Sequence, residues 1–160
     1  MEYTERFESP VIEEYGKVVN FKDAYLQPDI TKEYKAVFSI EDNKDPKAVS
    51  DHLLHVALLL NILNVSGIPK ENIKVAVVIS GKGTDITLNN DVYRKLHGQD
   101  NPNLGIEKQL VDNGVELFVC GQSIAQLGFE EKDLNDYILF SLSALTDLLV
   151  LQQKGYLLLP

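Results

Sequence analysis

Five segments of the chain carry the apolar pattern of β-strands. Residues 73–79 read Ile-Lys-Val-Ala-Val-Val-Ile, an almost continuous aliphatic run that is typical of a central parallel strand covered on both faces. Residues 115–119 read Val-Glu-Leu-Phe-Val, which has the period of two that a strand shows, between Gly114 and Gly121. The five predicted strands are residues 34–40, 73–79, 115–119, 137–142 and 156–159.

Helical patterns separate these strands. After the first strand, Asp45 is a predicted N-cap and Pro46 a predicted first helical residue. Apolar residues then recur every three or four positions from Val49 to Leu63, and Gly67 ends the predicted helix. Shorter helices are predicted at residues 90–96, 104–113, 123–127 and 144–154, the last capped by Ser143, with a turn or short helix at 133–136.

The alternation of strands with capped helices predicts the fold class. A right-handed crossover through a helix brings consecutive strands into parallel pairing, so the pattern indicates an α/β protein with a parallel sheet covered on both faces. With 160 residues, 44% of them hydrophobic, the chain is long enough to form one core. We therefore expect a single α/β domain over residues 34–160.

Residues 1–33 differ from the rest of the chain, because they show little periodicity and contain Pro10, Gly16 and Pro28. They predict an extended N-terminal arm. The arm has five aromatic residues, too many to leave in water: Tyr3, Phe7, Tyr15, Phe21 and Tyr25. Two interpretations remain open, packing on the surface of the domain and packing on a neighbouring subunit.

Composition excludes some classes of partner. Fifteen basic and 24 acidic residues give a net charge of −9, and no cluster of Lys or Arg interrupts the acidity, so we expect no nucleic-acid partner. No apolar run is long enough to span a membrane, and residues 1–6 have no signal-peptide pattern. The chain as given therefore predicts a cytoplasmic protein without a membrane partner.

The single cysteine, Cys120, is the first candidate for chemistry. It cannot form an internal disulfide, and it lies at the carboxyl end of a predicted strand, where open α/β sheets place their ligands. The helix predicted to follow offers unpaired backbone N–H groups, which favour a thiolate. Gly121, Gln122 and Ser123 are candidate donors to that thiolate. The alternative is that Cys120 is only a buried small hydrophobe.

The loop at residues 80–85, Ser-Gly-Lys-Gly-Thr-Asp, has the glycines of a phosphate-binding loop but not their spacing. Position 76 is alanine and position 86 is isoleucine, where the two common nucleotide motifs need glycine. We expect instead that Gly81 forms part of an open rim beside Cys120, with Lys82 as a cation near the thiolate. His52 and His55 have a spacing that suits a metal but no third ligand in a recognisable motif, so we expect neither a metal nor a cofactor.

Several segments together resemble the DsrE/DsrF-like family, over about residues 34–159. The most specific is Val119-Cys120-Gly121-Gln122-Ser123. The other segments are residues 59–62, 77–81, 84–85, 88–89, 101–103, 114–116, 143–146 and 152–156.

The resemblance implies a three-layer α/β/α domain with a five-stranded, mainly parallel sheet, of the YchN-like type, assembled as a trimer or hexamer. It also implies that Cys120 matches the thiol that carries sulfane sulfur as a persulfide in the sulfur-relay members. Two functions follow as expectations. One is a sulfur carrier or sulfurtransferase that exchanges sulfur with a thiol or persulfide partner protein. The other is a non-catalytic, oligomeric small-molecule-binding or regulatory module.

Overall fold

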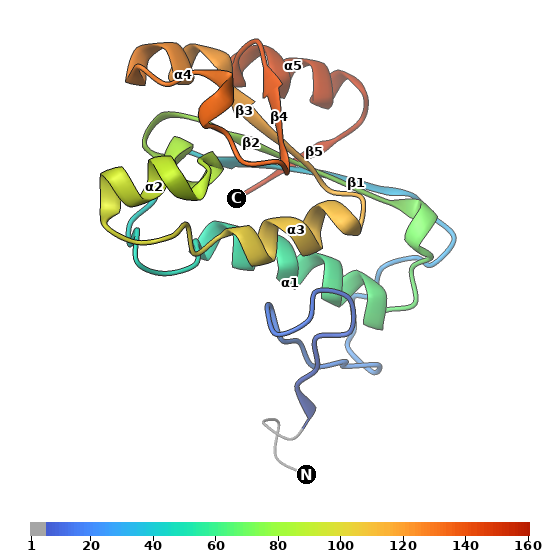
Figure 1. The fold of residues 1–160 in the computed structure, drawn as a ribbon. Helices are drawn as coiled ribbons and strands as arrows, with labels where there is room; N and C mark the ends of the chain where they lie inside the picture. Colours follow the sequence, from blue (N-terminus) through green and yellow to red (C-terminus); the bar gives the residue numbers. More distant parts are fainter. Residues whose placement is uncertain (1–5) are drawn as a thin grey trace.

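A single five-stranded sheet runs through the computed structural model, which describes residues 6–160 (Figure 1). All four strand pairs are parallel, and the spatial order is β4-β3-β2-β1-β5. The predicted parallel α/β fold is confirmed. The strands are β1 (Tyr34–Ile40), β2 (Ile73–Ile79), β3 (Glu116–Cys120), β4 (Ile138–Ser141) and β5 (Leu157–Leu159).

Helices lie on both faces of the sheet and make a three-layer α/β/α arrangement. In Figure 1, α1 and α3 lie below the sheet, whereas α4 and α5 lie above it. The α-helices are α1 (Asp51–Val65), α2 (Asn90–His97), α3 (Leu104–Asp112), α4 (Gly121–Leu127) and α5 (Ala144–Gln153). Short 3-10 turns are η2 (Lys70–Asn72), η3 (Gly81–Thr87) and η4 (Glu131–Asp133). Within the described residues, no helix has the length and apolar character needed to cross a membrane.

The predicted start of α1 is wrong by about five residues. The helix begins at Asp51, and its N-cap is Ser50, whose side chain accepts a hydrogen bond from the Leu53 N–H. Asp45 closes a separate turn, because its carboxylate accepts from the Lys47 N–H at 3.0 Å. Asp45 and Ser50 are both good caps, and the local sequence does not decide between them. The other elements begin and end close to the predicted positions, except that η3 replaces a plain loop.

The α1 and α3 face of the sheet holds the main core. Sixteen buried apolar residues from the strands, α1, α3 and the arm form one cluster there. The α5 face has a cluster of four buried residues: Val37, Ala76, Val78 and Leu151. Central strands therefore bury side chains on both faces, as their continuous apolar sequences predict.

The arm packs against α1 around one buried amide. Asn61 of α1 accepts hydrogen bonds from the N–H groups of Val11 and Ile12, both at 3.0 Å, and donates to the carbonyls of Tyr15 and Gly16, both at 2.9 Å. Ile12 is fully buried in the main core. This part of the arm lies on its own domain.

A close backbone approach explains the glycine at position 16. A Cβ there would lie 2.7 Å from the Leu58 nitrogen, and the residue has a φ of +61°. The remaining arm aromatics are placed differently, because Phe7, Phe21 and Tyr25 are exposed. Residues 1–5, with Tyr3, lie outside the described residues.

Candidate functional site

Cys120 lies where three elements meet. It is the last residue of β3, it precedes the first residue of α4, and it pairs in register with Ser141 of β4. It follows Phe118 by two residues, so both side chains lie on the α5 face of the sheet. Only 5% of the residue is exposed. The thiol is therefore enclosed, with α5 above it.

Hydrogen bonds stabilise the thiolate form of Cys120. Burial raises the pKa of the thiol, but donors act against it: the Ser123 hydroxyl and the backbone N–H groups of Ala144, Ser123 and Gln122. Together the donors outweigh burial, so the pKa lies below the ordinary value for cysteine. Ala144 is the first residue of α5, and Gln122 and Ser123 lie in the first turn of α4. The sulfur thus receives donors from the amino ends of two helices.

Ser123 is oriented by the loop after β2. Its hydroxyl oxygen is buried and accepts a hydrogen bond from the Gly81 N–H at 3.0 Å. Because the oxygen accepts from Gly81, the hydroxyl proton can point toward the Cys120 sulfur. Gly81 has a φ of +54°, a conformation that favours glycine. The loop after β2 therefore orients the Ser123 hydroxyl through the hydrogen bond from the Gly81 N–H.

Gly121 and Gln122 hold the segment before α5 in place. A Cβ at Gly121 would lie 2.6 Å from the Ser141 carbonyl oxygen, so only glycine allows this approach of β4. The exposed Gln122 side chain donates to the Leu142 carbonyl at 3.1 Å. Both residues fix the turn that presents the Ala144 N–H to the sulfur.

The structure places four of the five predicted partner residues around Cys120. Gly121, Gln122 and Ser123 lie in α4, and Gly81 reaches the site through Ser123. Lys82 is exposed, and its side chain makes no hydrogen bond or ion pair with another described residue. The sequence prediction missed Ala144. Nothing in the sequence near position 144 indicates contact with position 120, because the approach depends on the strand order.

A groove with a volume of about 380 Å³ lies next to the site, between α5, Phe118 of β3 and Leu142 just after β4. Its lining is mostly apolar: Phe118, Leu142, Thr146, Asp147, Val150, Leu151 and Lys154. One carboxylate oxygen of Asp147 accepts a hydrogen bond from the Ser141 hydroxyl, and the other is buried without a hydrogen-bond partner among residues 6–160. The groove gives an apolar approach to the turn over Cys120.

The histidines do not assemble a metal site among residues 6–160. The Nε2 atom of His52 is hydrogen-bonded to the Asp42 carboxylate at 2.9 Å, and the Nε2 atom of His97 is hydrogen-bonded to the Asp85 carboxylate at 2.8 Å. No group of three or more His, Cys, Asp or Glu side chains in that part of the chain has a geometry that could hold a metal ion.

The profile of one known protein family matches most of this chain. The profile of the DsrE/DsrF-like family matches residues 35–160, which include Cys120, α1 to α5 and the sheet apart from the first residue of β1. The chain belongs to the DsrE/DsrF-like family. The match begins inside β1, so the arm lies outside the part that is shared with the family profile.

One solved structure has a similar fold. It is the protein of unknown function MTH1491 from Methanobacterium thermoautotrophicum, with a TM-score of 0.56 and 19% identity over 79% of this chain and 98% of that one. At this identity the likeness concerns the fold alone. No curated protein matches the chain.

Proposed function

We propose that this protein is a sulfur carrier of the DsrE/DsrF-like family, with Cys120 as the residue that bears the transferred sulfur. One observation carries the proposal: the only cysteine of the chain is buried at the amino ends of α4 and α5, where the neighbouring donors hold the pKa of its thiol below the ordinary value. Family membership makes a sulfur-relay role plausible. The proposal includes a cytoplasmic location, where thiols stay reduced.

The proposed reaction is an exchange of sulfur between thiols. The Cys120 thiolate attacks the outer sulfur of a donor persulfide, R–S–SH. A bond forms between Cys120 Sγ and that sulfur, the S–S bond of the donor breaks, and the donor leaves as the thiolate R–S⁻ with the electron pair. The proton stays on the transferred sulfur, so the step needs no oxidant or reductant. An acceptor thiolate reverses these roles and releases Cys120.

The hydrogen bonds to Cys120 serve both halves of this exchange. A lowered pKa increases the thiolate fraction that attacks the donor, and it also makes Cys120 a better leaving group in the second half. Ser123 and Ala144 supply donors that are fixed before the reaction, one by the Gly81 N–H and the other by the start of α5. Gly121 and Gln122 position these donors. Lys82 is proposed only to attract an anionic donor at the exposed rim.

Burial of the sulfur favours a second candidate. With 5% of the residue exposed, Cys120 needs a local opening before a protein persulfide can reach it. The turn at residues 141–144, held by Gln122, is the segment whose movement would expose the sulfur. If that turn does not open, Cys120 is a packing residue, and the protein is a non-catalytic, oligomeric binding or regulatory module.

We also propose a homo-oligomer, a trimer or hexamer, formed through the α5 face. Leu145 and Leu149 of α5 are 78% and 64% exposed, and Leu139 on the same face is 46% exposed. Apolar side chains gathered in this way usually mark an interface. The expected partners are thus copies of this chain and a thiol or persulfide protein.

Intact mass measurement separates the two functions. The reduced protein is mixed with glutathione persulfide, desalted and weighed, and we expect a gain of one sulfur atom that Cys120→Ser abolishes. Addition of glutathione to the desalted protein should remove that sulfur again. A protein that gains no sulfur while folded, yet gains it in denaturant, would establish Cys120 as a packing residue.

A further inference from the structure

The turn between β4 and α5 carries the Ala144 N–H, the donor that lies farthest from Cys120 in the sequence. Ser141 ends β4 and pairs in register with Cys120, and α5 begins at Ala144. Residues in register on neighbouring parallel strands lie side by side on the same face of the sheet. The place of the Ala144 N–H at the sulfur therefore depends on how the start of α5 is joined to the end of β4.

One side-chain hydrogen bond makes this junction. The Ser141 hydroxyl donates to a carboxylate oxygen of Asp147, in the first turn of α5. The two residues are six positions apart, and Ala144 lies midway between them. The bond thus joins the strand beside Cys120 to the helix turn that carries the donor.

The N-cap of α5 does not make this connection. The Ser143 hydroxyl accepts from the Thr146 N–H at 3.0 Å, and the Asp147 N–H donates to the Ser143 carbonyl at 2.9 Å. These bonds start the helix, but both of their ends lie after β4, so they leave its position against the sheet open.

A second side-chain bond reaches the same turn from α4, through Gln122 and the Leu142 carbonyl, but it is exposed. The bond between Ser141 and Asp147 is part-buried. Water competes less with a hydrogen bond that is withdrawn from solvent. The part-buried bond is therefore the firmer of the two.

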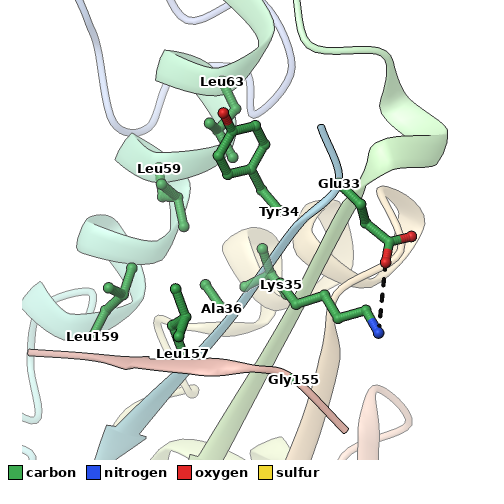
Figure 2. Close-up of a pocket in the computed structure, with 10 residues that line it drawn as sticks. Glu33, Tyr34, Lys35, Ala36, Leu59, Leu63, Gly155, Leu157 and Leu159 are labelled. Carbon is green, nitrogen blue, oxygen red and sulfur yellow. Dashed lines mark ion pairs between the residues drawn. The ribbon is translucent and has the colours of Figure 1, made fainter. Parts of the chain in front are cut away.

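No ion pair places the Asp147 carboxylate. Glu33, which lines a groove between α1 and β5, lies 3.5 Å from Lys35 Nζ and 3.3 Å from Lys74 Nζ, and Figure 2 shows the pair with Lys35. Asp147 also lines a groove, but it makes no ion pair with another described residue. Its bond from the Ser141 hydroxyl is the interaction that orients the carboxylate.

The second carboxylate oxygen of Asp147 is buried without a hydrogen-bond partner among residues 6–160. A buried acceptor without a donor costs free energy, so stability alone does not favour a carboxylate at this position. Departures from the local rules of stability are expected at functional sites. This one lies on the turn over Cys120.

We propose that Asp147 is a positioning residue for Cys120: through the Ser141 hydroxyl it holds the amino end of α5, with the Ala144 N–H, at the sulfur. The proposal rests on the proposed function for its use, because a donor matters to the reaction only if the thiolate reacts. The positioning itself can be measured without any persulfide.

The carboxylate also has a direct electrostatic effect, which opposes its positioning role. A negative charge near a thiolate raises the pKa of the thiol, whereas a donor held at the sulfur lowers it. Asparagine separates the two effects. It has no charge, and its side-chain oxygen can still accept from the Ser141 hydroxyl.

The matched variants Asp147→Asn and Asp147→Ala test the positioning role. Neither has the charge, so we expect the thiol pKa of Asp147→Ala to exceed that of Asp147→Asn by about 0.4 to 1 pH unit, the effect of one donor. The ultraviolet absorbance of the thiolate gives this pKa, as the difference between each protein and its Cys120→Ser counterpart. This readout does not require the buried sulfur to react. Equal thiol pKa values in the two variants would overturn the proposal.

Ser141→Ala tests the same bond from its other end. It keeps the carboxylate and removes the donor, so the thiol pKa should rise above the wild-type value. The double variant with Asp147→Ala should have the thiol pKa of Asp147→Ala alone, and an additive rise would show that the two residues act independently, against the proposal. Thr31→Ala removes a hydroxyl-to-carboxylate bond to Asp29 in the arm and is the matched control.

Sulfur uptake from glutathione persulfide separates this proposal from the proposed function. A higher thiol pKa leaves less thiolate but makes it more nucleophilic, so Asp147→Ala should take up sulfur at neutral pH about two- to threefold more slowly than Asp147→Asn. The pKa difference in a protein that takes up no sulfur would refute the sulfur carrier and support the positioning role. Uptake at equal rates, with equal thiol pKa values, would refute the positioning role alone.

Discussion

The two faces of the sheet use the same strands but are covered to different degrees. Helices α1 and α3, with Ile12 of the arm, bury sixteen apolar residues on one face, whereas α5 buries four on the other. On the α5 side, Leu139 and Leu158 at the two edges of the sheet remain 46% and 48% exposed. The short α4 and α5 leave both edges of the sheet uncovered on this side.

The face that stabilises the domain is therefore not the face that holds the proposed site. The α1 and α3 face provides the apolar burial that stabilises a domain of this size. The α5 face holds Cys120, the donors at the start of α5 and the exposed leucines. A thinly covered face can open locally at small cost, and the sulfur transfer that we propose for the buried Cys120 requires such an opening.

The largest expected effect comes from removing a core side chain on the thickly covered face. Leu53 is fully buried in the main cluster, so Leu53→Ala should lower the free energy of unfolding by about 2–5 kcal/mol. Leu149→Ala, at a residue 64% exposed on α5, should change it by less than about 0.5 kcal/mol. Urea denaturation at low protein concentration compares them, and equal losses would refute the asymmetry between the faces.

Loss of the arm anchor should rank next. Asn61→Ala leaves the Val11 and Ile12 N–H groups and two carbonyls without their partner, which should cost about 2–3 kcal/mol. The arm should also become sensitive to protease. Asn64→Ala, at an exposed position on the same helix, is the matched control. An arm that stays protected in Asn61→Ala would mean that apolar packing alone holds it.

The same face buries a carboxyl group, which predicts a pH effect of intermediate size. Burial raises the pKa of Glu107 well above 4.5, against the opposing effect of its hydrogen bond from Asn135. Above pH 4.5 the unfolded chain loses this proton while the folded protein keeps it. Stability therefore falls as pH rises, until the folded pKa is passed, by at most about 1.4 kcal/mol per pH unit.

Glu107→Gln should remove this contribution, because the amide does not titrate. Urea denaturation between pH 5 and pH 8 covers about three pH units, all of them above the ordinary pKa of glutamate. Over this range the free energy of unfolding should change less with pH for the variant than for the wild type. The exposed Glu131→Gln is the control and should keep the wild-type slope. Parallel profiles for wild type and Glu107→Gln would show that Glu107 is ionised in the folded protein.

The smallest expected effect concerns the thinly covered face itself. Ser123→Ala removes the hydroxyl donor to Cys120, so the thiol pKa should rise and the iodoacetamide rate at neutral pH should fall about two- to tenfold. The pH at half-maximal rate should move upward with it. Ser66→Ala, at a hydroxyl that bonds only within α1, should leave the profile unchanged. A rate that is limited by opening would instead be the same in all three proteins.

Sequence patterns predicted the sheet well because the strands of this fold are strongly apolar. Residues 73–79 match β2 completely, and residues 115–119 differ from β3 by one residue at each end. The start of α1 was wrong because two good caps, Asp45 and Ser50, lie close together. Local signals identify elements more reliably than they choose between competing boundaries.

The site was predictable mainly where it is continuous in the chain, and Gly81 is the one distant residue that the prediction included. Gly121, Gln122 and Ser123 follow Cys120 directly, so their role could be inferred from a strand that leads into a helix. The Ala144 donor could not, because it depends on β4 lying beside β3. Asn61 was missed for a similar reason, since its four partners are 45 to 50 positions away.

The strand order also has a consequence during protein synthesis. β2, β3 and β4 can each add to a preceding strand as they leave the ribosome, but the outer edge of β1 pairs only with β5, more than a hundred residues later. Until then the nascent chain exposes an unpaired apolar strand, which favours aggregation. We expect a ribosome-bound chain that ends before Leu157 to bind chaperones more strongly than one that has released β5.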